Sequence, residues 1–212
     1  MLTSYGDTKV NWTLYASTSS PYTRKVRIVL SECDLSAHTQ EVFVSPLVES
    51  EERNTLLALN PLAKIPTLIT PEGESLYDSR VICEYLAARI GWNEAATDAP
   101  PHTWACQRRA ALADGILDCA FNVVMERRRP APARSAEWLA RWQRNIERAA
   151  HALAEEMADA GNFDLSAIGT VCAVDYLDFR LPDLAAVPDT LRTWRQHHEG
   201  RKSVVSTMPT DG

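Results

Sequence analysis

Four consecutive hydroxyl side chains precede a predicted helix near the start of the chain. Residues 17–20 read Ser-Thr-Ser-Ser, and Pro21 follows at a position typical of the first residue of a helix. Ser20 is therefore the expected N-cap, whose side-chain oxygen accepts a hydrogen bond from the first turn. A hydroxyl at the positive end of a helix can also stabilise an anion. The cluster thus predicts a cap, an activating group, or both.

Two further segments place chemistry-bearing residues at the start of an element. Asp78 and Ser79 begin a predicted helix, so they either form an anion site with its unpaired amides or serve only as caps. Ile65-Pro66 opens an apolar strand, at a position where a proline is disfavoured in a central strand and indicates an edge strand.

The cysteines and histidines do not have the spacing of a metal or redox site. The chain has five of each; the cysteines never form C-x-x-C, which is typical of small core residues in a reducing compartment. They are Cys33, Cys83, Cys106, Cys119 and Cys172. The adjacent histidines His197-His198 would diverge on a helix. We therefore expect no metal.

Composition argues against nucleic-acid and membrane partners. The net charge of −6 and pI near 5.4 leave no broad basic face, and Arg127–Arg129 fit the negative end of a helix. No apolar stretch approaches the ~20 residues that span a bilayer. The polar first residues lack the apolar core of a signal peptide. We expect a cytoplasmic protein.

The elements that must position these residues alternate in the first 90 residues. The order β-α-β-α-β-β-α predicts an α/β domain over 12–90, with a parallel βαβ unit followed by a hairpin and a covering helix. Strands are expected at 12–16, 38–44, 65–70 and 75–77, and helices from Pro21, over about 50–59, and from Asp78 to a terminating Gly91.

After residue 90 the pattern becomes helical. Residues 91–101 contain turn formers without periodicity and are the expected linker. Two long helical faces, one starting at Trp104, are separated by the breaker at 130–133. Helices at roughly 164–181 and 184–198 and a loose tail follow. We expect an all-helical domain over 102–209.

Four stretches, in this order and at these separations, resemble the cytosolic glutathione transferases. They are SSPYTRKVRIVL, NPLAKIPTLI, YDSRVICEYLA, and YLDFR with its tail VVSTMP, and they cover residues 12 to about 209. Among bacterial members, the chain is similar to a small group that carries ALADGILD, found here at 111–118. The resemblance implies a thioredoxin-like domain followed by an all-α domain, a homodimer, and transfer of glutathione to a small electrophile, as in detoxification.

The resemblance also implies a role for the opening hydroxyls. In serine-type members the hydroxyl just before the first helix contacts the glutathione sulfur, which by alignment is Ser20, with Thr18 or Ser19 as substitutes and Tyr15 as a weaker candidate. Lowering a thiol pKa from about 8.5 by ~1.5–2 requires ~2–2.7 kcal/mol. A hydroxyl donor to a charged sulfur supplies ~1.5–3 kcal/mol and a helix N-terminus ~0.3–1 kcal/mol, so the magnitudes suffice.

Other glutathione contacts are implied in the same way. The peptide before Pro66 would be cis, with the Ile65 backbone pairing with the cysteinyl unit like an added strand. Asp78 and Ser79 would hold the γ-glutamyl group, although Asp is shorter than the usual Glu or Gln. Lys64 would reach the glycyl carboxylate, or is simply solvated.

Some positions depart from the family or reach beyond this site. Ala63 replaces the usual glycine, and the stretch 164–167 keeps a helix cap without the reciprocal acid of a capping box. The electrophile should bind between the domains, near Thr18 and the helix starting near His102. Asp114 and Arg108 either reach a partner subunit or are solvated.

Two other functions stay open at this point. A glutathione-dependent reductase or lyase would normally need a cysteine at position 20, where this chain has serine. A non-catalytic binding or regulatory protein of the same fold would not need turnover, because a fold alone does not fix a function.

Overall fold

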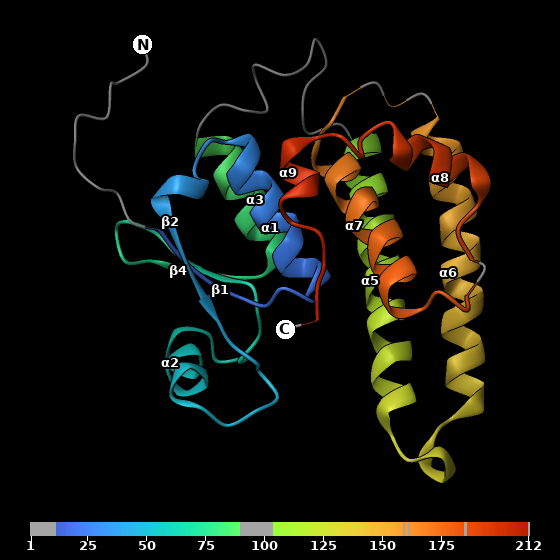
Figure 1. Ribbon diagram of the computed structural model, residues 1–212, viewed down its shortest axis with the longest axis horizontal. Helices are drawn as coiled ribbons and strands as arrows, with labels where there is room; N and C mark the ends of the chain where they lie inside the picture. The colour runs from blue at the N-terminus through green and yellow to red at the C-terminus, as the bar shows by residue number, and fades with distance from the viewer. Residues whose placement is uncertain (1–11, 90–103, 159, 161, 185, 212) are drawn as a thin grey trace.

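The computed structural model describes residues 12–89, 104–158, 160, 162–184 and 186–211. Figure 1 shows a small sheet with its helices beside a bundle of longer helices. Both expected domains are present, an α/β unit followed by an all-helical unit. The predicted linker 91–101, Gly91 and His102 lie outside the described residues.

The sheet has four strands in the order β2-β1-β3-β4. The strands are β1 (Trp12–Ala16), β2 (Thr39–Phe43), β3 (Thr67–Ile69) and β4 (Ser75–Leu76). β1 pairs with β2 in parallel and with β3 antiparallel, and β3 pairs antiparallel with β4. This confirms the predicted βαβ unit and hairpin, although β3 is shorter than the predicted 65–70.

Alternate side chains of β1 pack into two different apolar clusters on the two faces of the sheet. Leu14 belongs to the main core with Val26 of helix α1, whereas Tyr15 packs with Leu56 of helix α2. The helices of this half are α1 (Pro21–Glu32), α2 (Glu51–Leu59) and α3 (Ser79–Arg89), with a short 3-10 turn at Ser36–His38. The sheet therefore separates α2 from α1 and α3, as Figure 1 shows.

The helical half is organised around one buried helix. Its helices are α5 (Trp104–Arg128), α6 (Ala136–Met157), α7 (Leu165–Arg180), α8 (Asp189–Gln196) and α9 (Lys202–Val205), with a 3-10 turn at Ala131–Ala133. Every residue of α7 from Ser166 to Leu177 is buried. A helix that is buried all round must be packed on several sides. α7 contacts α5, α8 and, from the other domain, α1.

Three expectations for this half were wrong. The helix predicted from 184 begins at Asp189, because Pro188 disfavours helical geometry at Val187 before it. Trp104 is 83% exposed and does not belong to the buried face of α5. The tail is not loose, since it forms α9, which packs against α1.

The cysteines are core residues, as predicted. All five lie in the described residues as thiols without disulfides, four of them buried and Cys119 half-buried. Burial raises the pKa of Cys33 and Cys83 to about 12 and that of Cys172 to about 11. None of the helices among the described residues is both long and apolar enough to span a membrane.

Candidate functional site

The strand register brings three of the predicted segments to one edge of the sheet. Tyr15 pairs with Thr67 in an antiparallel ladder, so the end of β1 lies beside the start of β3. Leu68 pairs with Leu76 in the next antiparallel ladder, so β4 ends at that same edge. The loop 17–20 after β1, the Ile65-Pro66 segment before β3 and the Asp78-Ser79 segment after β4 therefore meet there.

Ser20 caps α1 and keeps a proton to donate. Its Oγ accepts a hydrogen bond from the Thr23 amide at 3.2 Å, which confirms the predicted N-cap. Within the described part of the chain, the Ser20 hydroxyl proton has no acceptor. A hydroxyl that accepts from an amide is polarised and becomes a better donor. The same Ser20 oxygen can thus cap α1 and donate a hydrogen bond to a sulfur.

The neighbouring hydroxyls are already engaged. Thr18 Oγ1 donates to the Thr210 carbonyl at 3.1 Å, and Ser19 Oγ lies 3.2 Å from Ser17 Oγ. Tyr15 is buried beneath α2 with Leu56. Ser20 differs from Thr18 and Ser19 because no described contact uses its hydroxyl proton, and from Tyr15 because it caps α1 and is not buried against α2.

The peptide bond between Ile65 and Pro66 is cis, as predicted. Because the β1–β3 ladder begins at Thr67, the Ile65 backbone N–H and C=O have no backbone partner among the described residues. The Lys64 carbonyl accepts hydrogen bonds from Asn60 Nδ2 at 3.1 Å and Thr67 Oγ1 at 2.9 Å. Asn60 and Thr67 are buried and hold this loop in place, leaving the Ile65 backbone available for an added strand.

Sequence reasoning missed the roles of Asn60 and Thr67. The signal for Asn60 was its place directly before Pro61, where the helix is expected to end because a proline disfavours helical geometry at the residue before it. Ala63 in the same loop adopts φ +50°, the left-handed region that favours glycine. The replacement of the usual glycine by Ala63 therefore places an L-residue in a conformation that glycine adopts more easily.

Asp78 and Ser79 have different roles at the start of α3. Asp78 Oδ1 accepts hydrogen bonds from the Arg80 amide at 3.0 Å and the Val81 amide at 3.5 Å. The Tyr77-Asp78 peptide is also cis. Ser79 is buried, and its amide and hydroxyl have no hydrogen-bond partner within the described ranges. An anion at this helix terminus would therefore meet the Ser79 donors, while Asp78 acts as the cap.

Lys64 and Arg108 have surface positions. The Lys64 side chain is exposed and makes no ion pair with the residues that the structure describes, so its ammonium is solvated. Arg108, a candidate for contact with a partner subunit, pairs with Glu156 of the same chain at 3.1 Å.

The ALADGILD stretch on α5 carries contacts to α1 that the sequence did not reveal. Asp114 pairs with Lys25, and Asp118 Oδ1 accepts from Tyr22 Oη at 2.5 Å. Asp114 therefore faces the other domain of its own chain. Burial alone would lower the pKa of Lys25, but the Asp114 carboxylate keeps it raised. Both acidic residues hold α1, the helix that Ser20 caps.

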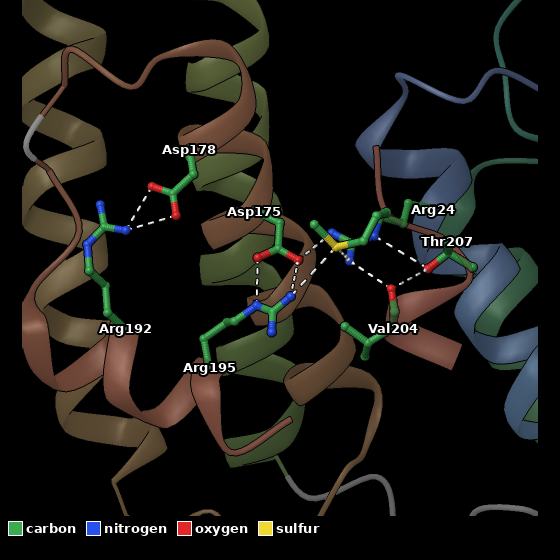
Figure 2. Close-up of polar contacts among 8 residues, drawn as sticks. Arg24, Asp175, Asp178, Arg192, Arg195, Val204 and Thr207 are labelled. Atoms are coloured by element: carbon green, nitrogen blue, oxygen red, sulfur yellow. Dashed lines mark hydrogen bonds and ion pairs between the residues drawn. The ribbon is translucent and has the colours of Figure 1, made fainter. Parts of the chain in front are cut away.

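A second group of charged side chains forms ion pairs between α1 and the helical domain. Figure 2 shows Asp175 of α7 between Arg24 of α1 and Arg195 of α8. The carboxylate lies 2.7 Å from Arg24 Nη1 and 2.6 Å from Arg195 Nε. All three side chains are largely buried. A buried pair of this kind is strongly destabilised when one partner is removed, because an uncompensated charge remains.

The described residues offer neither a metal cluster nor a reactive thiol. No group of three His, Cys, Asp or Glu side chains among them could hold a metal ion. Burial is the main cause of a raised pKa at every cysteine. A raised thiol pKa disfavours the thiolate that nucleophilic or redox chemistry needs.

Comparison with known proteins gives consistent relatives. The family model of the glutathione S-transferase N-terminal domain matches residues 14–94. The uncharacterized GST-like protein YibF of Escherichia coli K12 is 33% identical over 171 residues, which cover 79% of this chain and 82% of that protein. A stringent starvation protein A homolog of Pasteurella multocida is 36% identical over 89 residues, 42% of this chain and 39% of that protein.

Two solved structures cover almost the whole chain. A glutathione transferase family member from Pseudomonas fluorescens Pf-5, with bound glutathione, has 35% identity and a TM-score of 0.83, covering 94% of this chain and 100% of that one. A glutathione S-transferase from Methylobacterium radiotolerans, in complex with glutathione sulfonate, has 30% identity and a TM-score of 0.83, covering 95% and 96%.

Proposed function

Because the chain belongs to the glutathione S-transferase family, we propose that it binds glutathione and activates its thiolate for attack on a small electrophile. The observation that carries the proposal is the Ser20 hydroxyl, which accepts from the Thr23 amide and has its proton available. That proton would be donated to the sulfur at the positive end of α1. Relatives of this length and similarity have been crystallised with glutathione or glutathione sulfonate.

The rest of the tripeptide has matching groups at the same sheet edge. The unpaired N–H and C=O of Ile65 would pair with the cysteinyl backbone as an added strand. The amide and hydroxyl of Ser79 would bind the γ-glutamyl carboxylate, and the acceptor-only carboxylate of Asp78 would attract the ammonium. Lys64 is the candidate for the glycyl carboxylate. Each group of glutathione thus meets a group of opposite polarity.

The chemistry would then proceed by positioning and thiolate stabilisation. The bound thiol loses its proton to solvent, and the hydrogen bond from Ser20 stabilises the negative sulfur. The sulfur donates its electron pair to an electrophilic carbon, forming a carbon–sulfur bond as a leaving group departs with its bonding electrons. Holding both reactants between the domains makes the step effectively unimolecular.

The alternatives are favoured less by the structure of the site. A reductase or lyase needs a low-pKa cysteine, whereas position 20 is serine and burial raises the pKa of each cysteine. A non-catalytic glutathione-binding protein would share the same binding residues, and it differs from a transferase only in the absence of turnover.

Binding and turnover separate these functions. Calorimetry with glutathione should give saturable binding, and an aryl halide should then be conjugated with release of halide. Binding without turnover across a broad electrophile panel would favour the non-catalytic alternative. Absence of glutathione binding would overturn both. The homodimer and the cytoplasmic location remain predictions; light scattering after gel filtration measures the first and cell fractionation the second.

A further inference from the structure

Met208 has a reactive group that the proposed function does not use. It follows α9, and its side chain is 46% exposed, whereas Met157 in α6 is completely buried. An exposed thioether is open to oxidation to the sulfoxide, while a buried one is protected. Met208 also borders a cavity of about 410 Å³, whose lining includes Arg195, Glu199 and Val205. A peroxide can therefore reach the sulfur, and an added oxygen atom has room.

Two arginines from different domains point donors at this sulfur. Arg24 Nη2 lies 3.3 Å from Met208 Sδ, and Arg195 Nη2 lies 3.8 Å from it. Arg24 is only 2% exposed, so its donors have little access to water. A thioether sulfur is a weak acceptor, and it satisfies charged donors poorly.

The two guanidinium groups beside the Met208 sulfur would bind an oxygen acceptor more strongly than they bind sulfur. Asp175 is the carboxylate that both Arg24 and Arg195 contact, and Figure 2 shows its two oxygens already used by them. An S=O group carries partial negative charge on oxygen and accepts hydrogen bonds strongly. Oxidation would thus change a weak acceptor into a strong one where two guanidinium groups converge.

We propose that Met208 is an oxidation site for hydroperoxides, and that Arg24 and Arg195 hold the resulting sulfoxide oxygen. The Met208 sulfur attacks one oxygen of the hydroperoxide, so the S–O bond forms as the O–O bond breaks. Sulfur loses two electrons, and the peroxide is reduced. The departing oxygen takes up the hydroperoxide proton and leaves as an alcohol, or as water when the oxidant is hydrogen peroxide.

The modification would fasten the C-terminal tail to the first domain. Two residues after Met208, Thr210 donates its amide to the Thr18 carbonyl at 3.4 Å and accepts from the Thr18 hydroxyl. A sulfoxide held by Arg24 of α1 would limit opening of this segment. The amides of Met208 and Thr210 report this directly, because both are hydrogen-bonded and the exchange of the Thr210 amide requires the tail to detach from Thr18.

The test begins with the full chain treated with hydrogen peroxide. Peptide mass spectrometry should find Met208 oxidised at least about tenfold faster than Met157, since exposure controls access. The tail amides of the oxidised protein should exchange about tenfold more slowly than those of the untreated protein, as a hydrogen bond to a charged group allows. Unchanged or faster exchange at full Met208 oxidation would show that the sulfoxide leaves the arginines, and would overturn the proposal.

Variants test the same contact without peroxide. Met208→Gln places an amide oxygen at a similar reach and should slow tail exchange, whereas Met208→Leu, which has no acceptor, should not. Equal exchange in these two variants would contradict the proposal. In oxidised Arg195→Lys protein the protection should fall, and Arg192→Lys is the matched control, because Arg192 pairs with Asp178 in the same cavity instead of contacting the sulfur.

Discussion

Thr18 and Thr210, which are 192 positions apart in the chain, exchange two hydrogen bonds. The Thr18 hydroxyl donates to the Thr210 carbonyl at 3.1 Å, and the Thr210 amide donates to the Thr18 carbonyl at 3.4 Å. The Thr18 hydroxyl is therefore already hydrogen-bonded to the C-terminal tail. This leaves the Ser20 hydroxyl, with its proton available, as the preferred donor to a sulfur.

Removing the Ser20 hydroxyl should raise the pKa of the bound thiol. Ser20→Ala should raise it by about 1–2 units and lower kcat/KM by about 10–100-fold, since it removes a hydrogen bond to a charged sulfur. Absorbance of the thiolate during a pH titration of the glutathione complex measures the shift. Ser19→Ala is the matched control and should leave the thiol pKa unchanged.

Ser20→Gly separates catalysis from helix capping. Both Ser20→Ala and Ser20→Gly lose the hydroxyl, but glycine is a good N-cap, so only the alanine variant should lose ~0.5–2 kcal/mol of stability. Similar loss of activity in both variants, with different urea midpoints, supports a direct role for the oxygen. Full activity in the glycine variant would transfer the role to another residue.

Ser79 should control affinity for glutathione more than the chemical step. Ser79→Ala removes one donor to the γ-glutamyl carboxylate and should weaken glutathione binding about tenfold or more, with little change in kcat. Calorimetry measures the affinity. An analogue that lacks this carboxylate should bind wild type and variant equally, and a remaining difference between them would argue against this contact.

The buried charges between the domains should dominate stability. Asp175→Asn leaves Arg24 and Arg195 without their carboxylate and should lower the free energy of unfolding by about 3–5 kcal/mol. Asp178→Asn, which breaks an exposed ion pair with Arg192, should change it by at most about 1 kcal/mol. Chemical denaturation of both variants gives the comparison. Equal effects would mean that burial of the charge is unimportant here.

Ala63 offers a stabilising substitution. At φ +50° an L-residue is strained by ~1–2 kcal/mol, and glycine relieves this at an entropic cost of ~0.5–1 kcal/mol. Ala63→Gly should therefore raise the free energy of unfolding by roughly 0.5–1 kcal/mol. Ala111→Gly, at an exposed position of α5, should instead lower it by about 1 kcal/mol. A loss of stability at both positions would contradict the argument.

The contact of Glu32 with α9 predicts acid sensitivity. Burial would raise the pKa of Glu32, but hydrogen bonds from Arg201 and Ser203 hold it below its ordinary value of 4.5. A depressed pKa contributes stability that is fully present above pH 4.5 and is lost as the pH falls through the folded value. Urea midpoints of wild type and Glu32→Gln should thus differ most above pH 4.5 and converge below it. A constant difference across that range would exclude this linkage.

Much of the first domain could be predicted because its signals are local. Ser20 before Pro21 specifies a helix start from adjacent residues, and the succession of strands along the chain follows from short apolar runs bounded by turn residues. The cis bond before Pro66 came from the resemblance, because a sequence alone favours trans. The start of α8 was predicted wrongly, since the apolar residues before Pro188 imitate helical periodicity.

The sequence by itself determined the domain order, the cap at Ser20 and the residue types at the sheet edge. Only the tertiary structure decided which hydroxyl is engaged and which charges are buried. Arg24 and Lys25 lie between the domains against Asp175 and Asp114, contacts that no local pattern in the sequence indicates. Helix caps and periodicity depend on residues within a few positions of one another. The pairs Arg24–Asp175, Lys25–Asp114 and Thr18–Thr210 join distant positions in the sequence, so they form only when the two halves of the chain pack together.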